Sequence, residues 1–115
     1  MKSIIEIIGY FTLINGDGTE NKTTKCKITG TITGTGGDLF DHYGDSDIHN
    51  VSFKPEMELS FVKSYLQDKN RNPITHRLNF NPEKRWYEGT YQDGDKIGRV
   101  QCILVEVPED FGRFA

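Results

Sequence analysis

The residues best suited to chemistry lie in the middle of the chain, where polar side chains alternate with apolar ones. Phe61, Lys63 and Tyr65 occupy alternate positions of one β-like segment, and His76 alternates with apolar residues in the next segment. Alternate residues of a strand point to the same face, so an amine, a phenol and an imidazole are expected on one surface. A surface rich in aromatic rings with a few polar groups is typical of a small-molecule pocket.

Two of these polar residues have both a functional and a purely structural interpretation. His76 would be a polar group of the pocket or, beside an acid, a general base. The alternative, which we favour, is a core histidine held by a tyrosine or by the backbone. Lys63 would pair with a carboxylate such as Glu88 inside the pocket, or extend along apolar surface to its rim. Trp86 and Tyr87 point to opposite faces of their strand, so only one of these rings faces the interior. The candidate ligand-binding residues are Phe61, Lys63, Tyr65, His76 and Trp86.

A glycine-rich and acidic segment, residues 34–47, is the only long loop that the sequence predicts. Its carboxylates would offer oxygen ligands to Ca²⁺, but their spacing does not fit an EF-hand. We therefore expect them to be solvated, and a single imidazole at His42 adds little to a metal site. The glycines do not match a phosphate loop or a dinucleotide fingerprint, which need a following helix. We expect neither a metal nor a cofactor. The carboxylates are Asp38, Asp41, Asp45 and Asp47.

Cysteine content, charge and hydropathy narrow the class of protein. Cys26 and Cys102 are the only cysteines, too few and too widely spaced for a metal signature or a disulfide framework. No export signal and no bilayer-spanning stretch is evident, so we expect reduced thiols in a cytoplasmic protein without membrane contact. The net charge of −3, with dispersed Lys and Arg, disfavours nucleic acid as a partner.

The elements that position these residues are predicted to be strands. The apolar fraction of 35% and the aromatic fraction of 11% suit an antiparallel sheet with one buried face. In the third predicted strand, His49, Val51 and Phe53 are expected to share one face. The predicted strands are residues 4–14, 22–33, 48–53, 57–66, 74–80, 85–91 and 96–107, with an eighth if the first breaks at Gly9.

The connections between these strands predict how they are arranged. Asp93 and Gly94 separate the last two segments, and such a pair is a strong hairpin signal because glycine supplies positive φ. Short connections favour up-and-down order over a Greek key. At 115 residues the chain is large enough for one core and too small for two. We predict an all-β fold, a single antiparallel and mostly up-and-down barrel of seven to eight strands over residues 1–115.

Short motifs between residues 34 and 99 resemble the small calycin-type barrels, the group that includes avidins and lipocalins. They are a glycine-rich acidic turn at 34–38, a Phe-x-Lys-x-Tyr strand at 61–65, and a hairpin with Trp and Gly at 86–91 followed by Gly98. The likeness is closest to uncharacterised avidin-like or lipocalin-like bacterial domains. The lipocalin Gly-x-Trp is missing near the N-terminus, and no set of avidin-like biotin contacts is found. The resemblance implies the barrel and not biotin binding.

Three hypotheses of function follow, in order of preference. The first is a non-enzymatic barrel that binds a small, largely apolar molecule, because an eight-stranded barrel just holds one small ligand or is filled by its own side chains. The second is a filled barrel that acts as an interaction module: an inhibitor, an immunity-type protein or a subunit of a homo-oligomer. Its exposed aromatic patch would involve Tyr43, Tyr87, Tyr91 or Phe114. The third is an isomerase or hydrolase using His76, which needs a carboxylate or nucleophile within hydrogen-bond reach.

Overall fold

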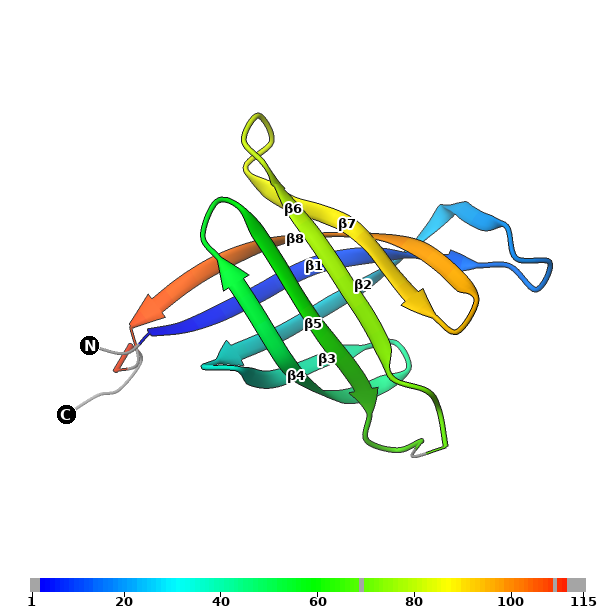
Figure 1. Ribbon diagram of the computed structural model, residues 1–115, viewed down its shortest axis with the longest axis horizontal. Helices are drawn as coiled ribbons and strands as arrows, with labels where there is room; N and C mark the ends of the chain where they lie inside the picture. Colours follow the sequence, from blue (N-terminus) through cyan, green and yellow to red (C-terminus); the bar gives the residue numbers. More distant parts are fainter. Residues whose placement is uncertain (1–2, 69, 109, 112–115) are drawn as a thin grey trace.

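The chain folds into one closed barrel of eight antiparallel strands in up-and-down order (Figure 1). The computed structural model describes residues 3–68, 70–108 and 110–111. Each strand pairs with its neighbours in the sequence, and β1 pairs with β8 to close the barrel. The predicted all-β, up-and-down barrel is confirmed. The strands are β1 (Ser3–Ile14), β2 (Glu20–Thr33), β3 (Gly36–Asp41), β4 (Gly44–Lys54), β5 (Glu58–Tyr65), β6 (Ile74–Asn81), β7 (Trp86–Asp93) and β8 (Lys96–Pro108). The described part of the chain has no helix able to cross a membrane.

The long loop predicted for residues 34–47 is wrong, because this segment forms a hairpin. β3 and the start of β4 pair in register, with Asp41 opposite Gly44 across a tight turn. Gly44 has a φ of 119°, a conformation that glycine adopts readily. β1 pairs continuously through Gly9 on both of its sides. The eighth strand therefore comes from the acidic segment and not from a break at Gly9.

A β-bulge in β4 changes which face its residues occupy. The pairing of β4 with β5 shifts between His49 and Ser52, and Asn50 has a φ of 53°. Val51 and Phe53 pack against the core, whereas His49 is on the outer side, with its Nδ1 3.6 Å from the Asp47 carboxylate. The expectation that His49 shares a face with Val51 and Phe53 is wrong because the extra residue of the bulge reverses the alternation.

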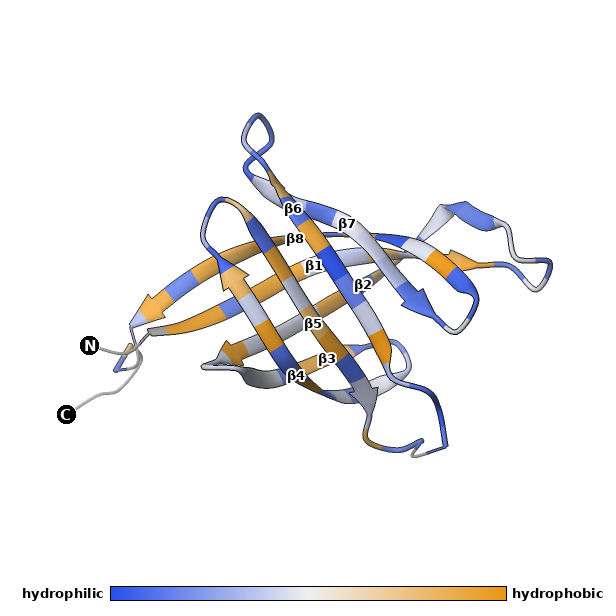
Figure 2. Ribbon diagram, in the orientation of Figure 1, coloured by the Kyte–Doolittle hydropathy of each residue, from blue (hydrophilic) through white to orange (hydrophobic). Residues whose placement is uncertain are grey.

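The middle of the barrel is filled by its own side chains. Residues from most strands point inward here and are at most 3% exposed, while polar residues alternate with them along the ribbon (Figure 2). Cys26 and Cys102 are free thiols in this core, and burial raises the pKa of Cys102 to about 12. Free space therefore lies toward an end of the barrel. The filling residues are Ile7, Ile28, Ile32, Leu39, Ile48, Leu59, Phe61, Leu78 and Val100.

The two ends of the barrel carry different connections. β1 begins and β8 ends at one of them (Figure 1). The opposite end, here called the open end, carries the β1–β2, β3–β4, β5–β6 and β7–β8 connections. β5 finishes at the open end with Tyr65, and β6 starts there with Ile74. Lys63, Tyr65 and His76 therefore lie in the half of the barrel nearest the open end.

Candidate functional site

A buried carboxylate, ammonium and phenol meet inside the open end. Asp41, at the end of β3, is 2% exposed, and Lys63, on β5, is 3% exposed. Lys63 Nζ donates to Asp41 Oδ2 at 2.8 Å and to Tyr65 Oη at 2.9 Å. Tyr65 Oη donates to the same Oδ2 at 2.7 Å, and the Tyr43 N–H donates to Asp41 Oδ1 at 2.7 Å. Both charges are thus paired and hydrogen-bonded, as burial requires. We call Asp41, Lys63 and Tyr65 the buried trio.

Burial governs the titration of the trio. Burial lowers the pKa of Lys63, and the hydrogen bond to Asp41 opposes that shift. Burial, and then the hydrogen bond to Asp41, raise the pKa of Tyr65, so the phenol keeps its proton at neutral pH. Lys63 Nζ also lies 4.5 Å from the ring centroid of Tyr65 and 5.3 Å from that of Phe11, within the range of cation–π attraction. The trio is therefore a fixed set of polar groups next to aromatic rings, and we call it the polar floor of the barrel end.

The prediction for Asp41 is wrong, and the prediction that Lys63 pairs with a carboxylate is confirmed, although the carboxylate is not that of Glu88. Asp41 is not a solvated loop carboxylate, because the unrecognised strand β3 places it at an inward position. Lys63 pairs with Asp41 rather than with Glu88, whose carboxylate is on the outer face and accepts from Asn81. The other three acidic residues of the segment are exposed. Among the described residues, no group of three or more His, Cys, Asp and Glu is placed to hold a metal ion.

His76 is held between two aromatic rings. Its ring stacks on Phe61, with centroids 4.5 Å apart and planes at 15°, and on Tyr91 at 5.9 Å and 28°. Nδ1 lies 3.3 Å from the Ile74 carbonyl oxygen, which assigns the hydrogen of the neutral ring to Nδ1. Burial, and then the charge of Lys63, lower the pKa of His76 to about 3. The ring is therefore neutral at pH 7, and Nε2 is a hydrogen-bond acceptor.

A cavity of about 210 Å³ lies at the open end, next to the trio and His76. Arg71 is part of its lining: the guanidinium carbon lies 4.7 Å from the Tyr65 ring centroid, and a 2.8 Å ion pair with Asp93 holds the side chain. The Tyr91 hydroxyl donates to the Thr12 carbonyl. The walls therefore combine apolar surface with a few fixed polar groups. The lining residues are Phe11, Leu13, Ile14, Tyr43, Lys63, Tyr65, Arg71, Ile74, His76, Tyr91, Asp93 and Lys96.

The structure brings together four of the five predicted ligand-binding residues. Lys63, Tyr65 and His76 line the cavity, and Phe61 lies beneath it against the His76 ring. Trp86 is elsewhere, because its indole N–H donates to the carboxylate of Glu88 on the outer face. Four further residues of this site were not predicted as ligand-binding residues: Asp41, Tyr43, Arg71 and Asp93. The one available signal was the shared parity of Leu39 and Asp41 within a short alternating segment.

The choice between Trp86 and Tyr87 is settled by burial. Tyr87 is the ring that faces the interior, and its hydroxyl accepts the Glu56 N–H at 2.8 Å. Tyr91 is buried on the same face of β7. The expectation of an exposed aromatic patch at Tyr87 and Tyr91 is therefore wrong. Tyr43 is 49% exposed at the rim of the cavity, and Phe114 lies outside the described residues.

The polar groups of the cavity are better suited to binding than to proton transfer. A histidine with a pKa of about 3 is a weak base at neutral pH, far from the value that general base catalysis favours. Within the described ranges, the hydrogen-bond partner of the His76 ring is the backbone of Ile74 and not a carboxylate or a nucleophile. The arrangement agrees with a core histidine held by the backbone.

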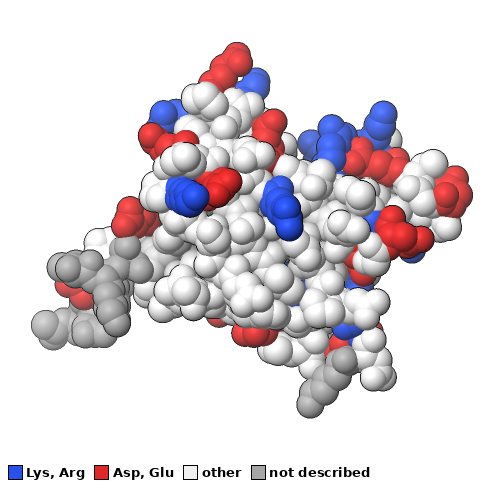
Figure 3. Space-filling model, viewed as in Figure 1, with Lys and Arg blue, Asp and Glu red and all other residues white. Residues whose placement is uncertain are grey.

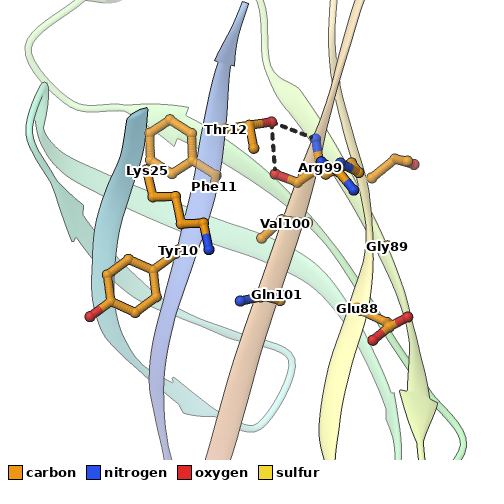
Figure 4. A pocket seen from close by; sticks show the side chains of 10 residues that line it. Tyr10, Phe11, Thr12, Lys25, Glu88, Gly89, Arg99, Val100 and Gln101 are labelled. Carbon is orange, nitrogen blue, oxygen red and sulfur yellow. Dashed lines mark hydrogen bonds between the residues drawn. The ribbon is translucent and has the colours of Figure 1, made fainter. Parts of the chain in front are cut away.

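A larger and shallower depression of about 450 Å³ lies on the outer face of β1, β7 and β8 (Figure 4). Lys25 and Tyr10 border it on one side and Glu88 on the other (Figure 4). Two of its three charged residues already have partners, because Arg99 contacts the carboxylate of Glu20 at 2.8 Å and Glu88 accepts a hydrogen bond from Asn81. Solvent competes for polar contacts on so open a surface, so the interior cavity is the stronger candidate site.

The outer face of β1 and β8 also carries a row of exposed apolar side chains. Ile8, Tyr10, Ile103 and Val105 are 41–45% exposed, and Ile8 lies directly opposite Ile103. We call these four residues the outer apolar row. On the face seen in Figure 3, charged side chains of both signs are interspersed. A cluster of partly exposed apolar residues is a feature of contact surfaces between proteins.

Searches of protein-family models, curated proteins and solved structures find no match to this chain. The geometry of the cavity is therefore the basis on which a function is assigned.

Proposed function

We propose that this chain is a calycin-like barrel that binds a small, largely apolar molecule in the open-end cavity without catalysing a reaction. One observation carries the proposal: a cavity of about 210 Å³, lined by apolar and polar side chains, onto which Lys63, Tyr65 and His76 converge. A concave, mostly apolar pocket with a few placed polar groups is the usual form of a ligand site. The resemblance of residues 34–99 to calycin-type barrels agrees with the barrel fold and does not by itself indicate a ligand.

The buried trio supports binding rather than a purely structural role. Lys63 and Asp41 form an ion pair with almost no exposure to solvent. Well-packed apolar residues of similar volume would be as stable or more stable in such a place. Functional sites are where a protein is expected to depart from the most stable packing, and this ion pair lies beside a cavity. The trio therefore fits the role of a fixed polar surface on which a ligand binds.

Native mass spectrometry of the protein purified from its own source tests this proposal. We expect one small molecule per chain in the wild type. The variant Ile14→Trp should lose it, because the larger side chain fills the cavity that Ile14 lines. Ile97→Trp is the matched control, since Ile97 is exposed and does not line the cavity. A ligand retained by Ile14→Trp, or a wild type that carries none and binds none from a library of small aromatic compounds, would overturn the proposal.

A second candidate function rests on the outer apolar row, which supports self-association of the barrel. Ile8 and Ile103 are paired across β1 and β8 and both point outward. Gel filtration with light scattering should then show a dimer or larger species, and Ile103→Lys should convert it to a monomer. Ile97→Lys, on the same outer side of β8 but outside the row, should not. A wild-type monomer at every concentration tested would exclude this candidate.

A further inference from the structure

The size of the open-end cavity limits the ligand to about one ring. Its volume is about 210 Å³, and a cavity of about 150 Å³ in another protein is known to hold benzene. Four aromatic side chains contribute to its walls, Phe11, Tyr65 and Tyr91 together with Tyr43 at the rim. A single aromatic ring with one small substituent fits this space and these surfaces. A long acyl chain or a fused polycyclic molecule exceeds it.

The charges around the cavity favour a ligand without net charge. Asp41 neutralises Lys63 at 2.8 Å, and Asp93 neutralises Arg71 at 2.8 Å. Lys96 lines the cavity from an exposed position, where water and salt screen its charge. A charged ligand would have to break one of the two pairs or remain uncompensated in a buried place. A neutral ligand avoids both costs.

On the inner face of β5 and β6, Lys63 keeps one donor and His76 keeps one acceptor that protein groups do not satisfy among the described residues. An ammonium has three hydrogens, and Lys63 gives two of them to Asp41 and Tyr65. The third has no acceptor among the described residues. His76 uses Nδ1 toward the Ile74 carbonyl, which leaves the lone pair of Nε2. Both side chains line the cavity, so water or a ligand atom there can complete these hydrogen bonds.

The register of β5 and β6 places these two groups close together. Lys63 lies opposite Ile74, and Phe61 lies opposite His76, so Lys63 and His76 are diagonal neighbours on the inner face. Diagonal neighbours have Cα atoms about 7–8 Å apart, within reach of long side chains. One atom between the two side chains can therefore contact both. A hydroxyl is the simplest group that accepts one hydrogen bond and donates another.

We propose that the open-end cavity selects a neutral, single-ring hydroxy-aromatic compound, a phenol in the simplest case. Its oxygen accepts a hydrogen bond from Lys63 Nζ, its hydroxyl donates to His76 Nε2, and its ring lies among Phe11, Tyr65 and Tyr91. This inference rests on the proposed function of the cavity and adds the chemical class of the ligand. It also assigns His76 a positioning role, as the acceptor that distinguishes a hydroxyl from an ether.

A panel of four ring compounds tests the inference: phenol, anisole, toluene and benzoate. Dissociation constants are measured by titration of the ¹⁵N-labelled protein, with the shifted amides showing where each compound binds. Anisole accepts but does not donate, so we expect it to bind about tenfold more weakly than phenol, the effect of one hydrogen bond. Toluene makes neither bond and should be weaker than anisole. Benzoate should bind more weakly than phenol because of its charge.

The variant His76→Phe tests the role of the imidazole nitrogen. Phenylalanine can keep the stack on Phe61 and Tyr91 but has no acceptor, so phenol and anisole should bind equally. His49→Phe, on the outer side, is the control and should keep the tenfold ratio. If His76→Phe does not fold, the four dissociation constants of the wild type still test the preference for a hydroxyl.

The outcomes separate this inference from the proposed function. Equal binding of phenol and anisole by the wild type, or tighter binding of benzoate, overturns the hydroxyl preference. If toluene and anisole still shift the amides of cavity residues, the proposed function survives that result. If no ring compound shifts them, both the inference and the proposed site fail.

Discussion

Replacing Asp41 by Asn is expected to lower the free energy of unfolding by about 3–5 kcal/mol at pH 7, the usual effect of removing one partner of a buried ion pair. The amide keeps the shape of the side chain and still accepts from Tyr65. It removes the counter-charge 2.8 Å from Lys63 Nζ, a side chain that is only 4% exposed. The ammonium of Lys63 is then buried without compensation.

Lys63 can lose its proton in the folded Asp41→Asn variant, and the free energy of that deprotonation sets an upper limit on the loss of stability. Deprotonating Lys63 in the folded variant costs about 1.4 kcal/mol per pH unit below its unfolded pKa of 10.5, or about 5 kcal/mol at pH 7. In that case the unfolded chain binds one more proton than the folded chain, so stability rises with pH. The difference between Asp41→Asn and the wild type should therefore shrink by up to about 1.4 kcal/mol per pH unit between pH 7 and pH 10.

A double-mutant cycle isolates the interaction. The double variant Asp41→Asn with Lys63→Met removes both charges and should be more stable than Asp41→Asn alone, with a coupling energy of at least about 2 kcal/mol. The exposed pair of Lys54 and Glu58 is the control, because its atoms are 3.4 Å apart on the surface. Glu58→Gln should change stability by less than about 1 kcal/mol.

Urea unfolding followed by circular dichroism at pH 7 and pH 9 measures these values. The reasoning is refuted if the free energy of unfolding of Asp41→Asn stays within about 1 kcal/mol of the wild-type value at pH 7. A buried ammonium without a counter-charge should destabilise the protein by more than that. It is also refuted if the deficit of the variant is the same at both pH values while the m value is unchanged.

Three further predictions concern other parts of the barrel. His76 has a folded pKa of about 3 against 6.5 when unfolded, so stability should fall by up to about 1.4 kcal/mol per pH unit as pH drops from 6.5 toward 3; urea unfolding of His76→Phe should lack this contribution. Gly98→Ala should cost about 1–3 kcal/mol by thermal or urea unfolding, because its Cβ would overlap the Tyr91 ring. Gly16→Ala, which meets nothing within 4 Å, should be neutral within about 0.5 kcal/mol. Both cysteine thiols are buried with raised pKa values and should react with Ellman's reagent only in denaturant; fast labelling of the native protein would contradict their placement.

The barrel could be predicted because local patterns agree along most of the chain. Period-two alternation is clear in β2, β5 and β6, and the Asp93–Gly94 pair joins β7 to β8 as a tight turn. The β3–β4 hairpin could not be predicted, because glycine and aspartate have low strand propensity. Pairing with β2 on one side and β4 on the other holds β3 in place. Closure of the barrel overrides local preference there.

Site residues could be predicted from the sequence where regular strand alternation alone decides which face a side chain occupies. Lys63, Tyr65 and His76 are inward because two neighbouring strands alternate regularly. Their partners depend on register instead. Asp41 lies 22 residues before Lys63 in the chain and meets it across β4, so its position follows from the β3–β4 turn and from two strand pairings. A single-residue change in either register would turn Asp41 outward, and no local pattern fixes both registers.

A polar floor explains why the barrel is filled in its middle and hollow at one end. Apolar side chains could collapse into the cavity, and in the middle of the barrel they do so with at most 3% exposure. At the open end, collapse would cover the third hydrogen of the Lys63 ammonium and Nε2 of His76 with groups that cannot bond to them. Covering both would cost about 1–3 kcal/mol for each unsatisfied group. Leaving room for water or a hydroxyl avoids that loss. The same groups that make this end less stable than an apolar core therefore keep the cavity open and define what enters it.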